Sequence, residues 1–375
     1  MKHRIGITGS YGGLNLGDEA ILASMLTSVR ARGHVEVVVF SANPADTKAR
    51  HGVRAVSIRE MHRDEVLEEL RTLDLLVVGG GGILFDGMAE RILRDVNWAR
   101  ELGVPVMIFA VSAGPLVSPE TRQLVLETLE QVDVITVRDA GAKRTLQDLG
   151  VSKAIEVTGD PALLLKPQPF TRQMLASAGV EPGATLVGFS VREPGPAAPD
   201  LDIDHYHTML ANAADFMVER FAAQVLFVPM EPGESRDPQH SHAVIARMAH
   251  AQRASVLKGD HASARILGLV GHMSFVVGMR LHFLIFSAIQ HVPFVPLPYA
   301  SKVSGLLADL EMPAREWSEL NTGRLCAYLD QSWDTRRQIA RRLSNTVPAL
   351  QERARRTPEI LSDLLDRIEP RKGRK

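Results

Sequence analysis

The chain has 375 residues, of which 45% are hydrophobic and 23% are charged, and its formal net charge is -1. This composition is typical of a globular protein, and it excludes a disordered chain, a collagen and a polycation built to bind nucleic acid. The single cysteine, Cys326, excludes an internal disulfide and cysteine-based zinc or iron–sulfur sites, and it fits a reducing compartment.

Short runs rich in valine and isoleucine alternate with amphipathic segments through the first half of the chain. Several runs are apolar on both faces, as in a parallel sheet covered by helices. The predicted strands are residues 4–8, 35–40, 73–78, 104–110, 132–137 and 155–158. The predicted helices are residues 17–32, 63–71, 89–102, 120–131 and 140–149. This βαβ series predicts a doubly wound α/β domain over residues 1–165.

A proline-containing segment, 159–183, interrupts this series and is the expected linker. The pattern then restarts, which predicts a second α/β domain over residues 180–330, similar to the first and facing it across a central cleft. Its predicted strands are residues 185–191, 224–228, 254–257, 274–277 and 294–296. Its predicted helices are residues 206–220, 240–250, 262–269 and 281–290.

Residues 331–375 are expected to form C-terminal helices and a basic tail. From Trp333 onward there are 12 Lys and Arg residues against 6 Asp and Glu residues. The favoured interpretation is a solvated helix surface with a frayed end. The alternative is peripheral contact with the anionic inner face of a membrane.

Neither a signal peptide nor a membrane span is predicted. Glycines interrupt the apolar run near the start of the chain. The longest apolar region, 274–298, contains Arg280, His282 and three prolines. We therefore expect a cytoplasmic protein.

The first candidate site follows the first predicted strand and opens a helix. Gly12 and Gly13 allow the backbone to approach a ligand, and a helix start offers free N–H groups to an anion. Asn15 can donate and accept hydrogen bonds, so we expect it to contact the ligand. Asp18 and Glu19 either cap the helix or accept a proton from the ligand.

Gly6, Gly9 and Gly12 also fit a dinucleotide-binding fingerprint, but two features disfavour NAD. The second strand ends in Phe-Ser-Ala-Asn at residues 40–43, without the acidic residue that binds ribose. In addition, no tyrosine has a lysine four residues later.

The second candidate site is a run of four glycines that follows a buried strand. Each glycine in a regular element costs about 0.5–1 kcal/mol relative to alanine, which favours close approach of a ligand to the backbone. A tight turn, the alternative, needs only one or two glycines. We expect Gly80, Gly81 and Gly82 to border a ligand crevice together with residues 112–115.

The third candidate site is the pair Arg280 and His282, at the end of a predicted strand in strongly apolar sequence. A guanidinium there needs an anion, which is either a ligand or a buried carboxylate such as Asp160. The imidazole can donate a proton near neutral pH, or it is a satisfied core histidine. We favour the functional interpretation for the pair.

Two further arginines end predicted strands. Arg192 is expected at the same sheet edge as Arg280. Arg138 is the matching position in the first domain, where it lines the crevice or forms a structural ion pair with Asp139. The pairs His205/His207 and His240/His242 lie in loop or polar sequence without a set of carboxylates, so we predict no metal site.

Together these motifs resemble the polysaccharide pyruvyl transferase family, in the right order and up to about residue 310. The resemblance is carried by the segments 9–19, 79–82, 137–139, 159–162, 188–192, 229–230, 278–282 and 299–307.

This resemblance implies two Rossmann-like domains in a glycosyltransferase-B-like arrangement, with the acceptor bound by the first domain and the donor by the second. It implies transfer of pyruvate from phosphoenolpyruvate to a pair of sugar hydroxyls, with release of phosphate and without a metal or nucleotide cofactor. The branch it looks most like acts on cell-wall or capsular polysaccharide precursors, and a lipid-linked saccharide is a compatible acceptor.

The donor residues that the resemblance implies are Arg192, Arg280, Leu281 and His282, with His282 as the acid. Two arginines suit the carboxylate and the phosphate of this donor. The chain departs from its relatives at 111–115, which is less glycine-rich. It also departs at the acidic segment 230–237, where relatives often carry a glutamine; both departures are expected to bear on the acceptor.

Two other functions stay open. A nucleotide-sugar glycosyltransferase would use a ribose-binding carboxylate late in the second domain, for which Glu311 and Glu316 are the nearest residues. A non-catalytic sugar-binding relative would have lost the anion-binding set, yet Arg192, Arg280 and His282 are all present.

Overall fold

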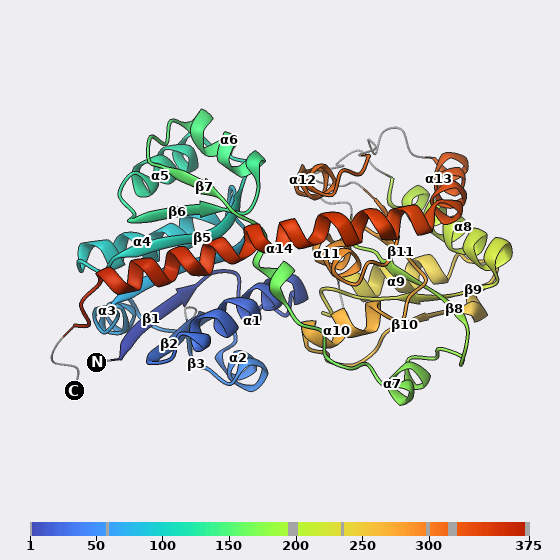
Figure 1. Ribbon diagram of the computed structural model, residues 1–375, viewed down its shortest axis with the longest axis horizontal. Helices are drawn as coiled ribbons and strands as arrows, with labels where there is room; N and C mark the ends of the chain where they lie inside the picture. Colours follow the sequence, from blue (N-terminus) through green and yellow to red (C-terminus); the bar gives the residue numbers. More distant parts are fainter. Residues whose placement is uncertain are drawn as a thin grey trace. The chain divides into compact units, whose positions relative to one another are not determined.

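The computed structural model describes residues 2–57, 60–193, 202–233, 236–297, 301–313 and 321–371. The chain divides into two compact units (Figure 1). Unit 1 contains Met1–Leu165 and Leu350–Lys375, and unit 2 contains Lys166–Ala349. The C-terminal segment is therefore shared between the units, because their boundary falls inside helix α14, Arg336–Arg367. The last four residues of the basic tail lie outside the described residues.

Unit 1 is built on a seven-stranded parallel sheet with the order β3-β2-β1-β4-β5-β6-β7. Its strands are β1 (His3–Thr8), β2 (Val35–Ser41), β3 (Arg54–Ser57), β4 (Leu75–Leu84), β5 (Val106–Ala113), β6 (Val134–Val137) and β7 (Ile155–Val157). The connecting helices are α1 (Leu16–Ala31), α2 (Pro44–His51), α3 (Arg63–Arg71), α4 (Ala89–Glu101), α5 (Pro119–Leu129) and α6 (Ala140–Leu149). A 3-10 turn, η1 (Pro161–Leu164), precedes the unit boundary.

Unit 2 is built on a five-stranded parallel sheet with the order β10-β9-β8-β11-β12. Its strands are β8 (Thr185–Ser190), β9 (Ala223–Phe227), β10 (Ala254–Val256), β11 (Phe275–Gly278) and β12 (Phe294–Pro296). Its helices are α7 (Arg172–Ser177), α8 (Ile203–Phe221), α9 (Asp237–Ile245), α10 (Ser263–Val270), α11 (Leu281–Ile289), α12 (Ser301–Asp309) and α13 (Thr322–Asp334). A short 3-10 turn, η3 (Ala251–Arg253), precedes β10.

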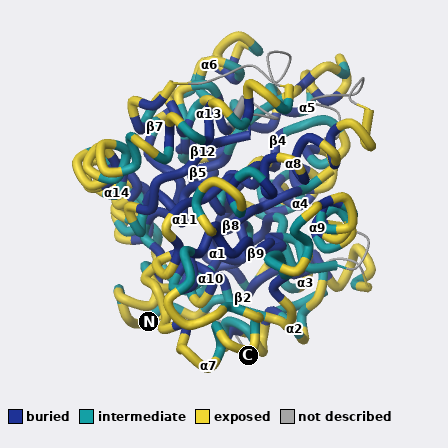
Figure 2. Tube along the Cα trace, turned by 90° about the vertical axis from the view of Figure 1, so that its right-hand side faces the viewer, coloured by how far each residue is buried: buried dark blue, intermediate teal, exposed yellow. Residues whose placement is uncertain are grey.

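The strands are largely buried, as Figure 2 shows by their dark colour. Strand β9 is buried at all five positions and β11 at all four, which explains why both are apolar on both faces. In unit 1, β4, β5 and the helices around them contribute to a continuous core that includes Val78, Leu93 and Ile108. Two rigid sheets of this kind hold the loops at their carboxyl ends in place.

Every predicted strand corresponds to an observed strand, with bounds that differ by a few residues. Strand β3 and helices α2, α7 and α12 were not predicted, and α13 begins at Thr322, before the predicted start of the C-terminal helices at residue 331. Helix α2 buries only Thr47, so it has no apolar stripe to detect, and β3 is an edge strand without a fully buried position. Helix α2 begins instead because the Asn43 side chain caps its N-terminus and Pro44 fixes φ in its first turn.

The prediction that β4 ends before its four glycines is wrong. The strand continues through them to Leu84, and Gly81 and Gly82 pair with Val111 and Ser112 of β5. Gly80 and Gly81 have φ angles of 62° and 86°, so glycine allows the strand to continue through a conformation that other residues avoid.

Within the described part of the chain, no helix is long and apolar enough to cross a membrane.

Candidate functional site

The strand order of unit 2 places its predicted donor residues at one point. Strands β8 and β11 are neighbours, but the chain leaves β8 toward β9 and reaches β11 only after β10. Such a switch point opens a crevice outside the carboxyl ends of the strands, where ligands of open α/β sheets bind. Arg192 follows β8 by two residues, and Arg280 follows β11 by two residues. Both predicted arginines therefore belong to this switch point.

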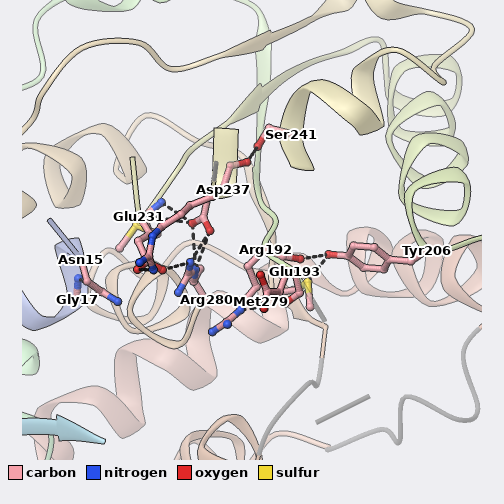
Figure 3. A network of polar contacts seen from close by, with 12 residues as sticks. Asn15, Gly17, Arg192, Glu193, Tyr206, Glu231, Asp237, Ser241, Met279 and Arg280 are labelled. Atoms are coloured by element: carbon pink, nitrogen blue, oxygen red, sulfur yellow. Dashed lines mark hydrogen bonds and ion pairs between the residues drawn. The ribbon is translucent and has the colours of Figure 1, made fainter. Parts of the chain in front are cut away.

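Two carboxylates hold the Arg280 guanidinium, which is only 10% exposed (Figure 3). Its Nε donates to Asp237 at 3.0 and 3.2 Å, and its Nη2 donates to the same carboxylate. The Nη2 also donates to Glu231 Oε2 at 2.5 Å. The structure thus gives Arg280 the buried carboxylate partners that were the alternative to a ligand, and they come from the segment that follows β9 and from the start of α9.

Asp237 anchors this arrangement from inside the unit. Its side chain is 1% exposed, and its Oδ2 accepts the backbone N–H groups of Met230 and Glu231 at 3.0 and 3.1 Å. Burial raises the pKa of Asp237, and the Arg280 guanidinium opposes that rise. The acidic segment 230–237, expected to bear on the acceptor, thus contacts the predicted donor residue.

Tyr206 ties the two arginine-bearing loops together. Its hydroxyl donates to the backbone oxygen of Arg192 at 2.8 Å and contacts the sulfur of Met279 at 2.6 Å (Figure 3). Burial, with the nearby Asp237 carboxylate, raises the pKa of Tyr206 well above its usual value. The hydroxyl therefore stays protonated and keeps its role as a donor.

The other two predicted donor residues begin α11. Leu281 is 6% exposed and belongs to the hydrophobic core, while His282 is half-buried at the second position of the helix. Ser190, the β8 partner of Gly278, has a fully buried hydroxyl without a hydrogen-bond partner among the described residues.

A pair of histidines lies close to the same charges. His207 Nε2 and His240 Nδ1 are 3.0 Å apart, and they lie on helices α8 and α9 rather than in loops. Burial and the charge of His240 lower the pKa of His207 to about 4. Burial also lowers the pKa of His240, and the charges that act on it include those of Arg192 and Arg280. The described residues contain no group of three His, Cys, Asp or Glu that could hold a metal ion.

The side chains of Asn15 and Glu19, from the first candidate site, form hydrogen bonds with other residues of unit 1. Asn15 caps α1, because its Oδ1 accepts from the N–H groups of Gly17 at 2.9 Å and Asp18 at 3.4 Å. Glu19 Oε1 accepts from the Gly12 N–H at 3.0 Å, and Oε2 contacts His51 Nε2 at 2.6 Å. Asp18 is half-buried at the helix start.

The glycines of unit 1 fall into two groups. A Cβ on Gly12 would lie 2.2 Å from Ser41 Oγ, and one on Gly80 would lie 2.1 Å from Ile21 Cγ2. These glycines, and Gly81, whose Cβ would lie 2.9 Å from Asp18 Oδ1, serve close packing inside the unit. Gly13 and Gly82 are exposed, and a Cβ on either would meet no atom within 4 Å. Only these two glycines of the predicted set have open space beside them.

Arg138 forms the structural ion pair that was the alternative to a ligand contact. It is 5% exposed, and its Nη1 donates to Asp160 Oδ2 at 2.9 Å. Its Nε also lies 3.6 Å from Asp139, which caps α6.

Three residues of the unit 2 site were not predicted as site residues: Tyr206, Glu231 and Asp237. The acidic character of 230–237 was a signal for the last two, whereas nothing in the sequence connects Tyr206 to the end of β8. Three predicted features lie outside the described residues: part of the segment 299–307, the residues Glu234 and Ser235, and Glu316. Glu311 is described, and its backbone oxygen accepts from Arg342.

A model of the polysaccharide pyruvyl transferase family matches residues 15–301. A search of curated proteins finds no match to this chain.

Several solved structures have the same fold. A UDP-GlcNAc 2-epimerase from Neisseria meningitidis, solved with bound UDP-GlcNAc, has a TM-score of 0.64 and 12% identity, covering 98% of this chain and 100% of that chain. A glycosyltransferase from Rickettsia africae has a TM-score of 0.63 and 10% identity, covering 98% and 99%. A UDP-GlcNAc 2-epimerase from Methanocaldococcus jannaschii has a TM-score of 0.60 and 14% identity, covering 88% and 92%. At such identities the likeness shows the fold alone. It confirms the predicted class: α/β, with two Rossmann-like units of the glycosyltransferase-B type and a C-terminal helix.

Proposed function

Because the chain belongs to the polysaccharide pyruvyl transferase family, we propose that it transfers pyruvate from phosphoenolpyruvate to two hydroxyls of one sugar. The acceptor is a polysaccharide or its precursor, such as a lipid-linked saccharide of the cell wall or capsule. The products are a pyruvate ketal and inorganic phosphate. The observation that carries the donor assignment is the placement of Arg192 and Arg280 at the switch point of unit 2.

The donor presents two anionic groups, a carboxylate and a phosphate. Arginine suits both, since its planar guanidinium donates two parallel hydrogen bonds. Asp237 holds Arg280 in one orientation through both Nε and Nη2, and Nη2 makes its second contact with the outer carboxylate, Glu231. Tyr206 holds the backbone of Arg192 beside it. The preoriented Arg280, together with Arg192, binds the donor and stabilises phosphate as it leaves.

The chemistry needs one acid and one place for protons to return. His282 donates a proton to the methylene carbon of the donor, which becomes the methyl group, and the cationic central carbon is attacked by the first sugar hydroxyl. The bond from this carbon to the phosphate oxygen then breaks, and the second hydroxyl closes the ketal. One hydroxyl proton restores His282, and the other leaves with phosphate or solvent.

Within unit 1, the acceptor is expected to lie over the exposed backbone at Gly13 and Gly82, since both have open space beside them. Asn15 has an amide nitrogen in addition to the oxygen that caps α1, and this nitrogen can donate to a sugar. Unit 1 contributes backbone and amide groups, as suits a neutral polyhydroxyl ligand.

Calorimetric titration tests the proposal. Phosphoenolpyruvate is expected to bind the wild-type protein saturably, and Arg280→Lys is expected to weaken that binding by about tenfold or more because it loses the forked donor. Lysine is chosen over alanine because Asp237 then keeps a counterion, and the melting temperature checks that the variant is folded.

UDP-N-acetylglucosamine and NAD are titrated in parallel. If the protein binds UDP-N-acetylglucosamine but does not bind phosphoenolpyruvate, the proposal is wrong and a glycosyltransferase function takes its place. Binding of glycans alone would favour a non-catalytic sugar-binding protein.

A further inference from the structure

The two carboxylates that hold Arg280 differ in how firmly they are built into unit 2. Asp237 is 1% exposed and makes contacts with two backbone N–H groups as well as with both Nε and Nη2 of Arg280. Its removal would leave several buried donors without an acceptor. Asp237 is therefore a fixed part of the loop, and it orients the guanidinium whether or not a ligand is present.

Glu231 is the outer of the two carboxylates. Its side chain is 13% exposed, against 1% for Asp237, and it contacts Nη2 of Arg280 at 2.5 Å through Oε2. Its other oxygen pairs with Arg236, whose side chain is 58% exposed. Glu231 can therefore leave Arg280 without losing its second partner, and Arg280 keeps its Nε contacts to Asp237 when it does.

Among Arg280, its two carboxylate partners and Arg236, the charges balance before any ligand arrives, and Arg192 lies outside this ion-paired set. Arg280 and Arg236 contribute two positive charges, and Asp237 and Glu231 contribute two negative charges. A donor with a carboxylate and a phosphate brings further negative charge to a guanidinium that is only 10% exposed. Like charges a few ångströms apart in a partly buried site repel strongly, so the donor and Glu231 cannot both take the Nη2 side of Arg280.

We propose that Glu231 is a specificity-determining residue that competes with the anionic donor for Nη2 of Arg280, so that donor binding exchanges one carboxylate for another anion. The inference rests on the proposed function for the identity of the donor. Its consequence is selectivity: a neutral ligand cannot replace the Glu231 carboxylate, whereas an anion with its own carboxylate or phosphate can. Asp237 acts differently, as a positioning residue for Arg280.

Glu231→Gln separates competition from a merely structural role. Glutamine has nearly the same shape and keeps a carbonyl oxygen, but it carries no charge. We expect phosphoenolpyruvate to bind this variant about tenfold more tightly than the wild type, since its charge-assisted competitor is gone. Loss of a purely structural contact would weaken binding instead. Glu231→Asp retains the charge on a shorter side chain, and we expect its affinity for phosphoenolpyruvate to increase less than that of Glu231→Gln.

The matched control is Glu219→Gln. Glu219 lies on α8 of the same unit, is 63% exposed and pairs with His250, so the variant removes the same charge away from Arg280. It is expected to leave phosphoenolpyruvate affinity unchanged. Inorganic phosphate is titrated against all four proteins as a simpler anion and should follow the same order. Melting temperatures confirm that each variant is folded.

The possible results separate the two proposals. If the wild type binds phosphoenolpyruvate and folded Glu231→Gln binds it equally or more weakly, the competition is wrong and the donor assignment stands. If the affinity of Glu219→Gln for phosphoenolpyruvate increases as much as that of Glu231→Gln, the effect comes from net charge. The proposed competition is then also wrong. If neither the wild type nor Glu231→Gln binds phosphoenolpyruvate or phosphate, both proposals are wrong. Binding that appears only in Glu231→Gln supports both.

Discussion

Glu19 and His51 form a buried pair in unit 1, with 2.6 Å between Oε2 and Nε2 and side-chain exposures of 1% and 6%. The second carboxylate oxygen of Glu19 accepts from the Gly12 N–H. Glu19 therefore connects the glycine-rich loop after β1 to the last residue of α2. The sequence predicts Glu19 as a helix cap or as a base, but in the structure one of its oxygens holds the loop and the other holds α2.

This relationship predicts that alanine substitutions at two adjacent acidic residues, Asp18 and Glu19, destabilise the protein by different amounts. Glu19→Ala leaves the buried Gly12 N–H without an acceptor, which should lower the free energy of unfolding by about 1–3 kcal/mol. Asp18→Ala, at the half-buried helix start, should lower it by less than about 1 kcal/mol. Urea denaturation measures both. Equal losses would show that Glu19 acts as a helix-end charge rather than as a link to the loop.

The glycine run of β4 predicts that alanine substitutions at Gly80 and Gly82 change stability by different amounts. Alanine at Gly80 would place a Cβ 2.1 Å from Ile21 Cγ2 at a φ of 62°. Overpacking and backbone strain should each cost about 1–3 kcal/mol of stability. Gly82→Ala meets no atom within 4 Å and should change stability by less than about 0.5 kcal/mol. Thermal unfolding of the two variants compares them directly, and a similar melting temperature for both would contradict the packing argument.

His282→Gln tests the acid of the proposed reaction. The variant should bind phosphoenolpyruvate with the affinity of the wild type, while turnover falls by about 10²–10⁴-fold, as for loss of a general acid. Phosphate release in the presence of acceptor measures turnover, and calorimetry measures binding. His272→Gln, at an exposed position of the same unit, is the control. Unchanged turnover in His282→Gln would remove this residue as the acid.

The pair of His207, which is buried, and His240, which is half-buried, predicts how stability depends on pH. The pKa of His207 is about 4 in the folded protein and about 6.5 in an unfolded chain. Between these values the unfolded chain binds more protons, so stability is complete above about pH 6.5 and falls as the pH decreases toward 4. His207→Gln should therefore lose less melting temperature than the wild type between about pH 7 and pH 5.

The control for this pH experiment is His205→Gln, two residues earlier in α8 and exposed. It should follow the wild-type curve. Parallel curves for the wild type and His207→Gln would show that His207 does not contribute to acid destabilisation.

Much of the fold could be predicted because the strands are short, apolar on both faces and bounded by glycine or proline. The exceptions have physical reasons. Helix α2 buries one residue, and its start depends on Asn43 and Pro44 rather than on a periodic apolar face. The glycines after Val78 look like a turn in the sequence, but pairing with β5 keeps them in the strand, and packing against α1 requires three of them.

The candidate site was predicted less completely. The sequence alone determined that Arg192, Arg280 and His282 follow strands of a parallel sheet, because strand ends are local features of the chain. The partners of Arg280 were decided only by the tertiary structure. The order β10-β9-β8-β11-β12 brings the loop after β9 to the end of β11 and sets Asp237 and Glu231 on a guanidinium 43 and 49 residues away in sequence. Local periodicity carries no information on strand order, and an ion pair between two loops depends on it.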